Sequence, residues 1–208
     1  WNAATGQPVT EPLLQNGSVR WATLSNDGKL ALTTSDSTAQ LWSVEKGQPL
    51  GQPLTHEGGV YYASFSPDGK FVATASGDKT AKIWGLGSTN AAPQILKHND
   101  WVNQVKFTPD GRYVVTCSSD GTAKVWEVPT GKQIGQTMQH GAAITMVSIS
   151  PNVHILATAS ADRTARLWDL KTGLPLSEPM ELSGEVKWVD FSPDGLWVSV
   201  AGIDGSVR

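Results

Sequence analysis

One tryptophan position returns along the chain with a fixed period of 42 residues. The series comprises Trp42, Trp84, Trp126 and Trp168, and Trp1 lies 41 residues before its first member. An aspartate series has the same period, at Asp36, Asp78, Asp120, Asp162 and Asp204. Self-similarity of this length means that one supersecondary unit is used five times, and such units bury their apolar faces against each other. The repeat therefore predicts a single domain over residues 1–208.

The second unit, residues 56–97, shows the local pattern. Apolar and β-branched runs alternate with turn sequences, in the order 60–65, Ser66-Pro67-Asp68-Gly69, 71–76, Gly77-Asp78-Lys79 and 80–84. Short strands with tight turns and no helical periodicity predict an all-β repeat. In the fourth unit Asn152-Val153 replaces the Asp-Gly of the first turn. Because valine tolerates positive φ poorly, we expect Asn152 to adopt that conformation.

These five units resemble the WD-repeat (WD40) family over the whole chain, and spacers such as Gly47-Gln48-Pro49-Leu50 resemble those of bacterial members. The resemblance implies an all-β β-propeller of four-stranded antiparallel blades around a central channel. The blades are expected at about 15–55, 56–97, 98–139, 140–181 and 182–208.

The two ends of the chain leave the number of blades in the ring open. Residues 1–14 resemble the outermost strand of a blade, and the last unit lacks such a strand. We therefore expect residues 1–14 to complete the last blade as its outer strand, and one of two arrangements left open is that this closes a five-bladed ring. The alternative is part of a larger propeller, for example a seven-bladed one. An open arc would expose sheet edges and apolar blade faces, which favour self-association.

In this family a histidine, a Ser or Thr, the turn aspartate and the tryptophan form a buried hydrogen-bond network in each blade. The matching residues are His56, Asp78 and Trp84, His98, Asp120 and Trp126, and His140, Asp162 and Trp168. Either Thr74 or Ser76 supplies the hydroxyl in the second unit. Gln15 and Leu182 stand at the histidine position of the first and fifth units, so we expect those blades to lack the full network.

The resemblance also implies that ligands bind the top face, the end of the propeller where the chain enters the first strand of each blade. The residues carried over to it are Arg20, Tyr61, Trp101, Asn103, Thr145, Glu185 and Lys187. Trp, Tyr and Arg dominate binding energies at protein interfaces. Trp101 and Tyr61 serve either a partner or the packing of their own blade. Trp21, Tyr62 and Trp188 occupy the next strand position, and we expect them to wedge between blades.

Composition narrows the classes of partner. Charged residues make up 17% of the chain, the net charge is −3 and no Lys/Arg run occurs, so no nucleic acid or anionic membrane is expected as partner. The sequence contains no run of 18 apolar residues, so no membrane span is predicted. We expect a cytoplasmic protein. The histidines are dispersed over different blades, and neither a phosphate-binding loop nor a nucleophile elbow is present, so we expect no metal or cofactor.

We therefore expect a non-catalytic scaffold that binds a protein or peptide through its top face. One alternative is a sensor or docking segment of a larger bacterial signalling protein with a kinase or NTPase domain. A second is a phospho-motif reader, which requires Arg20 and Lys187 to form a cationic cluster. A third is a propeller hydrolase, which requires acidic, His or Ser residues to converge near the channel, where the top-face set offers Glu185 and neutral hydroxyls.

Overall fold

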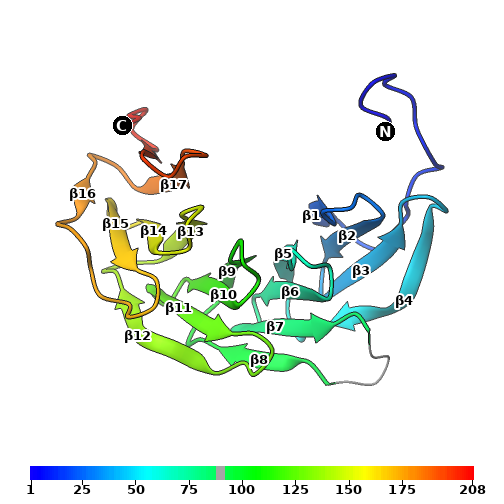
Figure 1. Cartoon of the computed structure of the whole chain (residues 1–208), viewed down its shortest axis with the longest axis horizontal. Helices are drawn as coiled ribbons and strands as arrows, with labels where there is room; N and C mark the ends of the chain where they lie inside the picture. The colour runs from blue at the N-terminus through cyan, green and yellow to red at the C-terminus, as the bar shows by residue number, and fades with distance from the viewer. Residues whose placement is uncertain (88–91) are drawn as a thin grey trace.

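The computed structural model describes residues 1–87 and 92–208, which form five antiparallel sheets in an open arc (Figure 1). The first sheet contains β1 (Val19–Leu24), β2 (Leu30–Ser35), β3 (Thr38–Ser43) and β4 (Gln48–Thr55). The second contains β5 (Val60–Phe65), β6 (Phe71–Ser76), β7 (Thr80–Gly85) and β8 (Gln94–Lys97). The third contains β9 (Val102–Phe107), β10 (Tyr113–Ser118), β11 (Thr122–Glu127) and β12 (Gln133–Gln139). The fourth contains β13 (Ile144–Ile149), β14 (Ile155–Ser160), β15 (Thr164–Asp169) and β16 (Met180–Glu181), and the fifth β17 (Val186–Phe191) and β18 (Val198–Gly202).

Each sheet is a blade whose strands pair in chain order. The first strand of each blade lies on the inner, concave side of the arc and the last strand of the four-stranded blades on its outer side (Figure 1). Short turns join the first strand of each blade to the second and, in the four-stranded blades, the second to the third, which favours the antiparallel pairing. Five inner strands, β1, β5, β9, β13 and β17, therefore line one concave wall.

The apolar core lies between blades rather than inside any one of them. Each core cluster combines residues of one blade with residues of the next, for example Ala81 of the second blade with Val102 of the third. Val60, Val102, Ile144 and Val186 stand at one repeat position, and all four are 0% exposed. Val19 stands at the same position of the first blade and is 52% exposed, because no other blade packs on that face in this structure.

The opposite end of the arc carries the other half of the same interface. Ala39, Ala81, Ala123 and Ala165 share a repeat position that faces the following blade, and all four are 0% exposed. Val207 stands at this position in the fifth blade and is 72% exposed. The two end faces of the arc are thus the two complementary halves of the contact that joins the inner blades.

The closed five-bladed ring, one of the two arrangements that the sequence left open, is not formed in this structure. Residues 1–14 contain no strand, and β17 pairs with β18 alone in the fifth sheet. The N-terminal segment lies instead beside the first blade, where Thr10 approaches the backbone of Gly47 so closely that a Cβ there would lie 2.9 Å from the Thr10 Cβ. The arc is open between its first and last blades (Figure 1).

The turn before β14 also differs from its expectation. Val153, not Asn152, has the positive φ, at 61°. The equivalent residues Gly28, Gly69, Gly111 and Gly195 have φ between 69° and 72°, so the turn keeps the geometry of the other blades despite its valine. Asn152 takes the role that Asp68 has in the second blade, since its side chain accepts a hydrogen bond from the Ser150 hydroxyl at 2.7 Å. Repeat geometry has overridden the local preference of valine.

In the second blade a chain of hydrogen bonds ties the inter-blade connection to the sheet. The Trp84 indole N–H donates to Thr74 Oγ1 at 2.9 Å, and the Thr74 hydroxyl lies 2.7 Å from His56 Nε2. His56 Nδ1 lies 2.8 Å from Asp78 Oδ2. Because the indole can only donate, the consistent assignment has Thr74 donating to Nε2 and the Nδ1 proton donated to the carboxylate. Thr74 is the network hydroxyl, whereas Ser76 donates to the Gly58 carbonyl.

The other blades vary this arrangement. The fourth blade repeats it, with His140 Nδ1 2.9 Å from Asp162. In the third blade His98 Nδ1 lies 2.9 Å from the Thr122 hydroxyl and 3.4 Å from Asp120. In the first blade Gln15 accepts a hydrogen bond from Thr33, the hydroxyl that also accepts from the Trp42 indole at 2.8 Å. Glutamine therefore replaces histidine at the threonine end of the network but has no hydrogen bond to Asp36 among the described residues.

Burial and hydrogen bonding set the protonation states. Burial lowers the pKa of His56, and it lowers the pKa of His98 to about 4, although Asp120 opposes the shift. Burial acts to raise the pKa of Asp78, but hydrogen bonds from Thr80 and His56 outweigh it and the pKa is lowered. Both groups are thus held as neutral imidazole and ionised carboxylate near neutral pH.

We expect Asp78→Ala and Asp120→Ala each to lower the free energy of unfolding by about 1–3 kcal/mol, because the first leaves the buried His56 N–H without its acceptor and the second leaves the Thr122 hydroxyl, which binds His98, without its own. Asp36→Ala should cost less than about 1 kcal/mol, since Asp36 is exposed and outside the network of its blade. Urea denaturation of the three variants measures the difference. Equal losses for all three would contradict a role for the histidine–aspartate contact.

We expect the free energy of unfolding to fall as the pH drops from about 6.5 to 4. Unfolded histidine titrates near 6.5, whereas His98 in the folded chain stays neutral down to about 4, so over this range the unfolded state binds more protons. His98 alone contributes a loss of up to about 3 kcal/mol. Urea titrations at pH 7, 5.5 and 4 measure it. His98→Gln should flatten the dependence, and the exposed His154→Gln should leave it unchanged.

Candidate functional site on the top face

Five of the seven predicted top-face residues stand at the same irregularity of the inner strands, whereas Trp101 and Glu185 lie just before their strands. In each blade the register between the first two strands shifts after the first residue of the inner strand, as between Val60 and Tyr62. A bulge of this kind adds one residue and re-aims its side chain. The added residues are Arg20, Tyr61, Asn103, Thr145 and Lys187.

Three of the predicted residues form an aromatic cluster, defined here as Arg20, Tyr61 and Trp101. The Arg20 guanidinium carbon lies 5.5 Å from the Tyr61 ring centroid, and the Tyr61 and Trp101 rings lie 5.9 Å apart at an interplanar angle of 51°. Trp101 is 52% exposed. The cluster thus joins three successive blades while half of the indole surface stays open to solvent.

Glycine makes room for Tyr61. A Cβ on Gly77 would lie 2.7 Å from the Tyr61 hydroxyl oxygen, and a Cβ on Gly59 would lie 3.3 Å from the Tyr61 ring. The tyrosine therefore lies directly against backbone from the two loops of its own blade. This close seat limits its rotamers, so the ring is presented to a partner at low entropic cost.

Asn103 and Thr145 connect neighbouring blades. The Asn103 side-chain amide donates to the Ile144 carbonyl at 2.9 Å, and the Thr145 hydroxyl donates to the Val186 carbonyl at 3.1 Å. Each side chain reaches the first residue of the next inner strand. These two predicted site residues therefore use their polar atoms to hold the blades in register.

Glu185 and Lys187 pair with each other on the fifth blade, with Lys187 Nζ 2.7 Å from Glu185 Oε2. Arg20 lies against Tyr61 at the other end of the arc. The structure therefore does not bring Arg20 and Lys187 into one cationic cluster, which a phospho-motif reader requires.

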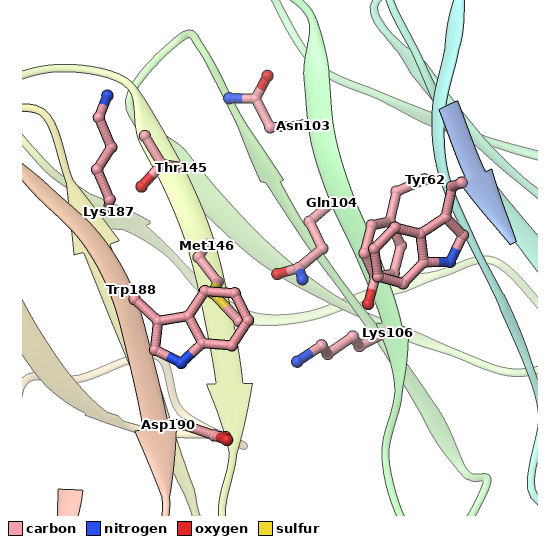
Figure 2. A pocket seen from close by; sticks show the side chains of 10 residues that line it. Tyr62, Asn103, Gln104, Lys106, Thr145, Met146, Lys187, Trp188 and Asp190 are labelled. Atoms are coloured by element: carbon pink, nitrogen blue, oxygen red, sulfur yellow. The ribbon is translucent and has the colours of Figure 1, made fainter. Parts of the chain in front are cut away.

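A second group of residues lines the concave wall and was missed in the sequence. Lys106 and Asp190 belong to a pocket of about 310 Å³ that also contains Tyr62, Gln104 and Trp188 (Figure 2). The signal was present in the repeat, because Lys106 and Asp190 stand where the other units carry Thr23, Ser64 and Ser148. A charged side chain at a position where the other repeats carry Ser or Thr marks a departure from the repeat pattern.

Of the three aromatic residues expected to wedge between blades, two pack against each other and the third does not. Trp21 and Tyr62 stack across the first two blades with ring centroids 4.1 Å apart. Trp188 is 53% exposed and lines the pocket, so the expectation is wrong for this residue. In this structure no other blade packs on the side of the fifth blade from which Trp188 projects.

No helix in the described part of the chain has the length and apolar character that crossing a membrane requires. Within residues 1–87 and 92–208, no group of three or more His, Cys, Asp or Glu side chains is arranged to hold a metal ion.

Comparison with known proteins agrees with the geometry of the blades. The family model described as WD domain, G-beta repeat matches five segments, at residues 8–43, 47–85, 93–127, 131–169 and 177–208. Comparison with curated protein sequences gives no match. WD repeats typically mediate protein–protein interaction. The five matched segments together span most of the sequence, and the chain belongs to the WD-repeat family.

Proposed function

We propose that this chain is a non-catalytic scaffold that binds a protein or peptide through the aromatic cluster of its top face. The observation that carries the proposal is the half-exposed Trp101, which packs on Tyr61 along one side and leaves the other side free. Aromatic residues held rigidly in this way lose little entropy on binding and supply much of the energy of an interface.

The chemistry of the cluster defines the partner further. Arg20 lies over the Tyr61 ring and, among the described residues, forms no ion pair. An exposed guanidinium beside two aromatic rings suits an extended segment with apolar side chains and a nearby acceptor or carboxylate. A cytoplasmic location, a bacterial source and a role as docking segment of a larger signalling protein stay predictions from the repeat spacers and composition.

We expect Trp101→Ala and Tyr61→Ala to weaken partner binding by about 2 kcal/mol or more, roughly 30-fold, because each removes an anchor of the cluster. The probe is a peptide selected from a phage-displayed random library panned on the whole chain, with affinity measured by calorimetry.

The matched control is Trp197→Ala, which removes a tryptophan that is 74% exposed in the turn before β18, away from the top face. It should leave the affinity unchanged. Peptides whose affinity depends on Trp197 but not on Trp101 would overturn the proposal, as would a chain from which no peptide can be selected. Thermal unfolding of each variant separates lost binding from lost structure.

A second candidate function is self-association through the ends of the arc. The exposed Val19 face and the exposed Val207 face are the two halves of an interface that the chain already forms between its inner blades. Joining the end of one copy to the start of another is a heterologous contact, which continues into a ring or an open chain of copies.

We expect the chain to elute as a species larger than its 22.2 kDa monomer mass in light scattering after size exclusion. Val19→Asp and Val207→Asp should each shift the population towards monomer, because a carboxylate in that contact is left without a partner. Ile95→Asp, at an isoleucine that is 52% exposed on β8 of the second blade, is the control. A wild-type monomer at all concentrations would contradict this function and leave the top-face proposal untouched.

A further inference from the structure

The pocket on the concave wall has a volume of about 310 Å³, at the lower end of the range for small-ligand sites. Its lining comes from the inner strands of all five blades, so residues far apart in the sequence meet there. Figure 2 shows Trp188 on one side, Tyr62 on the other, and Gln104 and Lys106 in the space between them.

Two flat apolar surfaces form opposite walls of this pocket. One is Trp188, whose side chain is half exposed, and the other is Tyr62, which is stacked on Trp21. Aromatic faces of this kind bind planar or apolar groups through dispersion and burial of area. The walls therefore suit a flat apolar body.

Lys106 supplies a positive charge between the walls. Its ammonium points into the space between Trp188 and Tyr62 (Figure 2), and it has no hydrogen bond or ion pair with any residue in the described part of the chain. Burial lowers the pKa of Lys106, while the charge of Asp190 acts to raise it. A partly desolvated ammonium without a direct partner gains most from an anionic oxygen.

The other polar groups of the pocket are already engaged in a way that leaves donors free. Asp190 accepts a hydrogen bond from Ser148 at 2.7 Å. The Gln104 side-chain oxygen accepts from the Val147 N–H at 2.8 Å, and its amide NH₂ group also lies within reach of the Tyr62 hydroxyl, so one of its two N–H bonds is left for a ligand. Lys106 and Gln104 thus present donors, and Asp190 is the one carboxylate among the residues that line the pocket.

We propose that this pocket binds a carboxylate carried on a flat apolar group, with Lys106 and Gln104 holding the carboxylate and Trp188 and the Trp21–Tyr62 stack holding the apolar body. Such a ligand is either a free aryl carboxylate or the C-terminal aromatic residue of a peptide. The site is separate from the aromatic cluster of the top face and does not rest on its function.

The test uses the whole chain and four probes measured by calorimetry. They are indole-3-acetate, its amide, the peptide acetyl-Gly-Gly-Phe with a free C-terminus, and the same peptide as C-terminal amide. We expect an acid to bind at least about tenfold more tightly than its amide, because the charged hydrogen bonds to Lys106 are lost in the amide. Binding of indole-3-acetate alone identifies a free ligand, and binding of the peptide acid identifies a chain terminus.

The variants make the inference specific to Lys106. Lys106→Met should weaken binding of the acid about tenfold or more, and Lys106→Arg should restore part of it. Asp190→Asn should tighten binding several-fold, since it removes a like charge from the pocket. Lys70→Met, at an exposed lysine outside the pocket, is the control.

Three results would overturn the proposal. They are a wild-type chain that binds none of the four probes, equal affinity for acid and amide, and equal affinity of the wild type and Lys106→Met for the acid. Thermal unfolding of each variant separates lost binding from lost structure. The tighter binding expected for Asp190→Asn is a gain in affinity, which a destabilised chain would not produce. Because none of the residues of the aromatic cluster lines this pocket, the outcome of these measurements is independent of the partner proposed for that cluster.

Discussion

The structure depends on one packing constraint, which is that each blade has two apolar faces and that no helix in the described part of the chain covers either of them. A sheet of this kind is stable only when a second sheet covers each face. The alanines at the position of Ala81 keep one face shallow, and the branched residues at the position of Val102 fill the space that this leaves. Because the same pair of faces meets at every inner interface, the number of copies is not set by any single blade. That is why the arc presents matching faces at its two ends.

The hydrogen-bond network links this packing to the top face. His56 follows directly on β4 of the preceding blade, and Asp78 lies in the turn between β6 and β7. Asp78 also accepts from the Glu57 backbone N–H at 3.1 Å, so the connection between blades is fixed on both sides of His56. The chain then enters β5, where the bulge aims Tyr61. The buried network therefore holds in place the loop from which the exposed residue projects.

Most of the blade architecture could be predicted from the sequence because the same pattern recurs in every repeat. The turns, the strands and the spacing of His56, Asp78 and Trp84 recur often enough to cancel local exceptions, which is also why Val153 adopts the φ of a glycine. The sequence pattern could not decide whether Thr74 or Ser76 supplies the hydroxyl of the network, since residues two apart lie on the same face of a strand. Only the distance of each hydroxyl from the indole decides between them. Ring closure was equally out of reach, because pairing of residues 1–14 with the last blade is a long-range contact that the repeat does not encode.

The residues with functional interest are those in which the repeats differ, and they fall on two adjacent levels of the inner strands. At the bulge, the first two inner strands carry Arg20 and Tyr61, while later strands use Asn103 and Thr145 to clamp neighbouring blades. On the wall, hydroxyl positions become Lys106 and Asp190. Neither change disturbs the frame, because the bulge residue lies outside the pairing and the wall residue faces the open concave side. A scaffold whose stability comes from the recurring residues can therefore alter either site without altering the other.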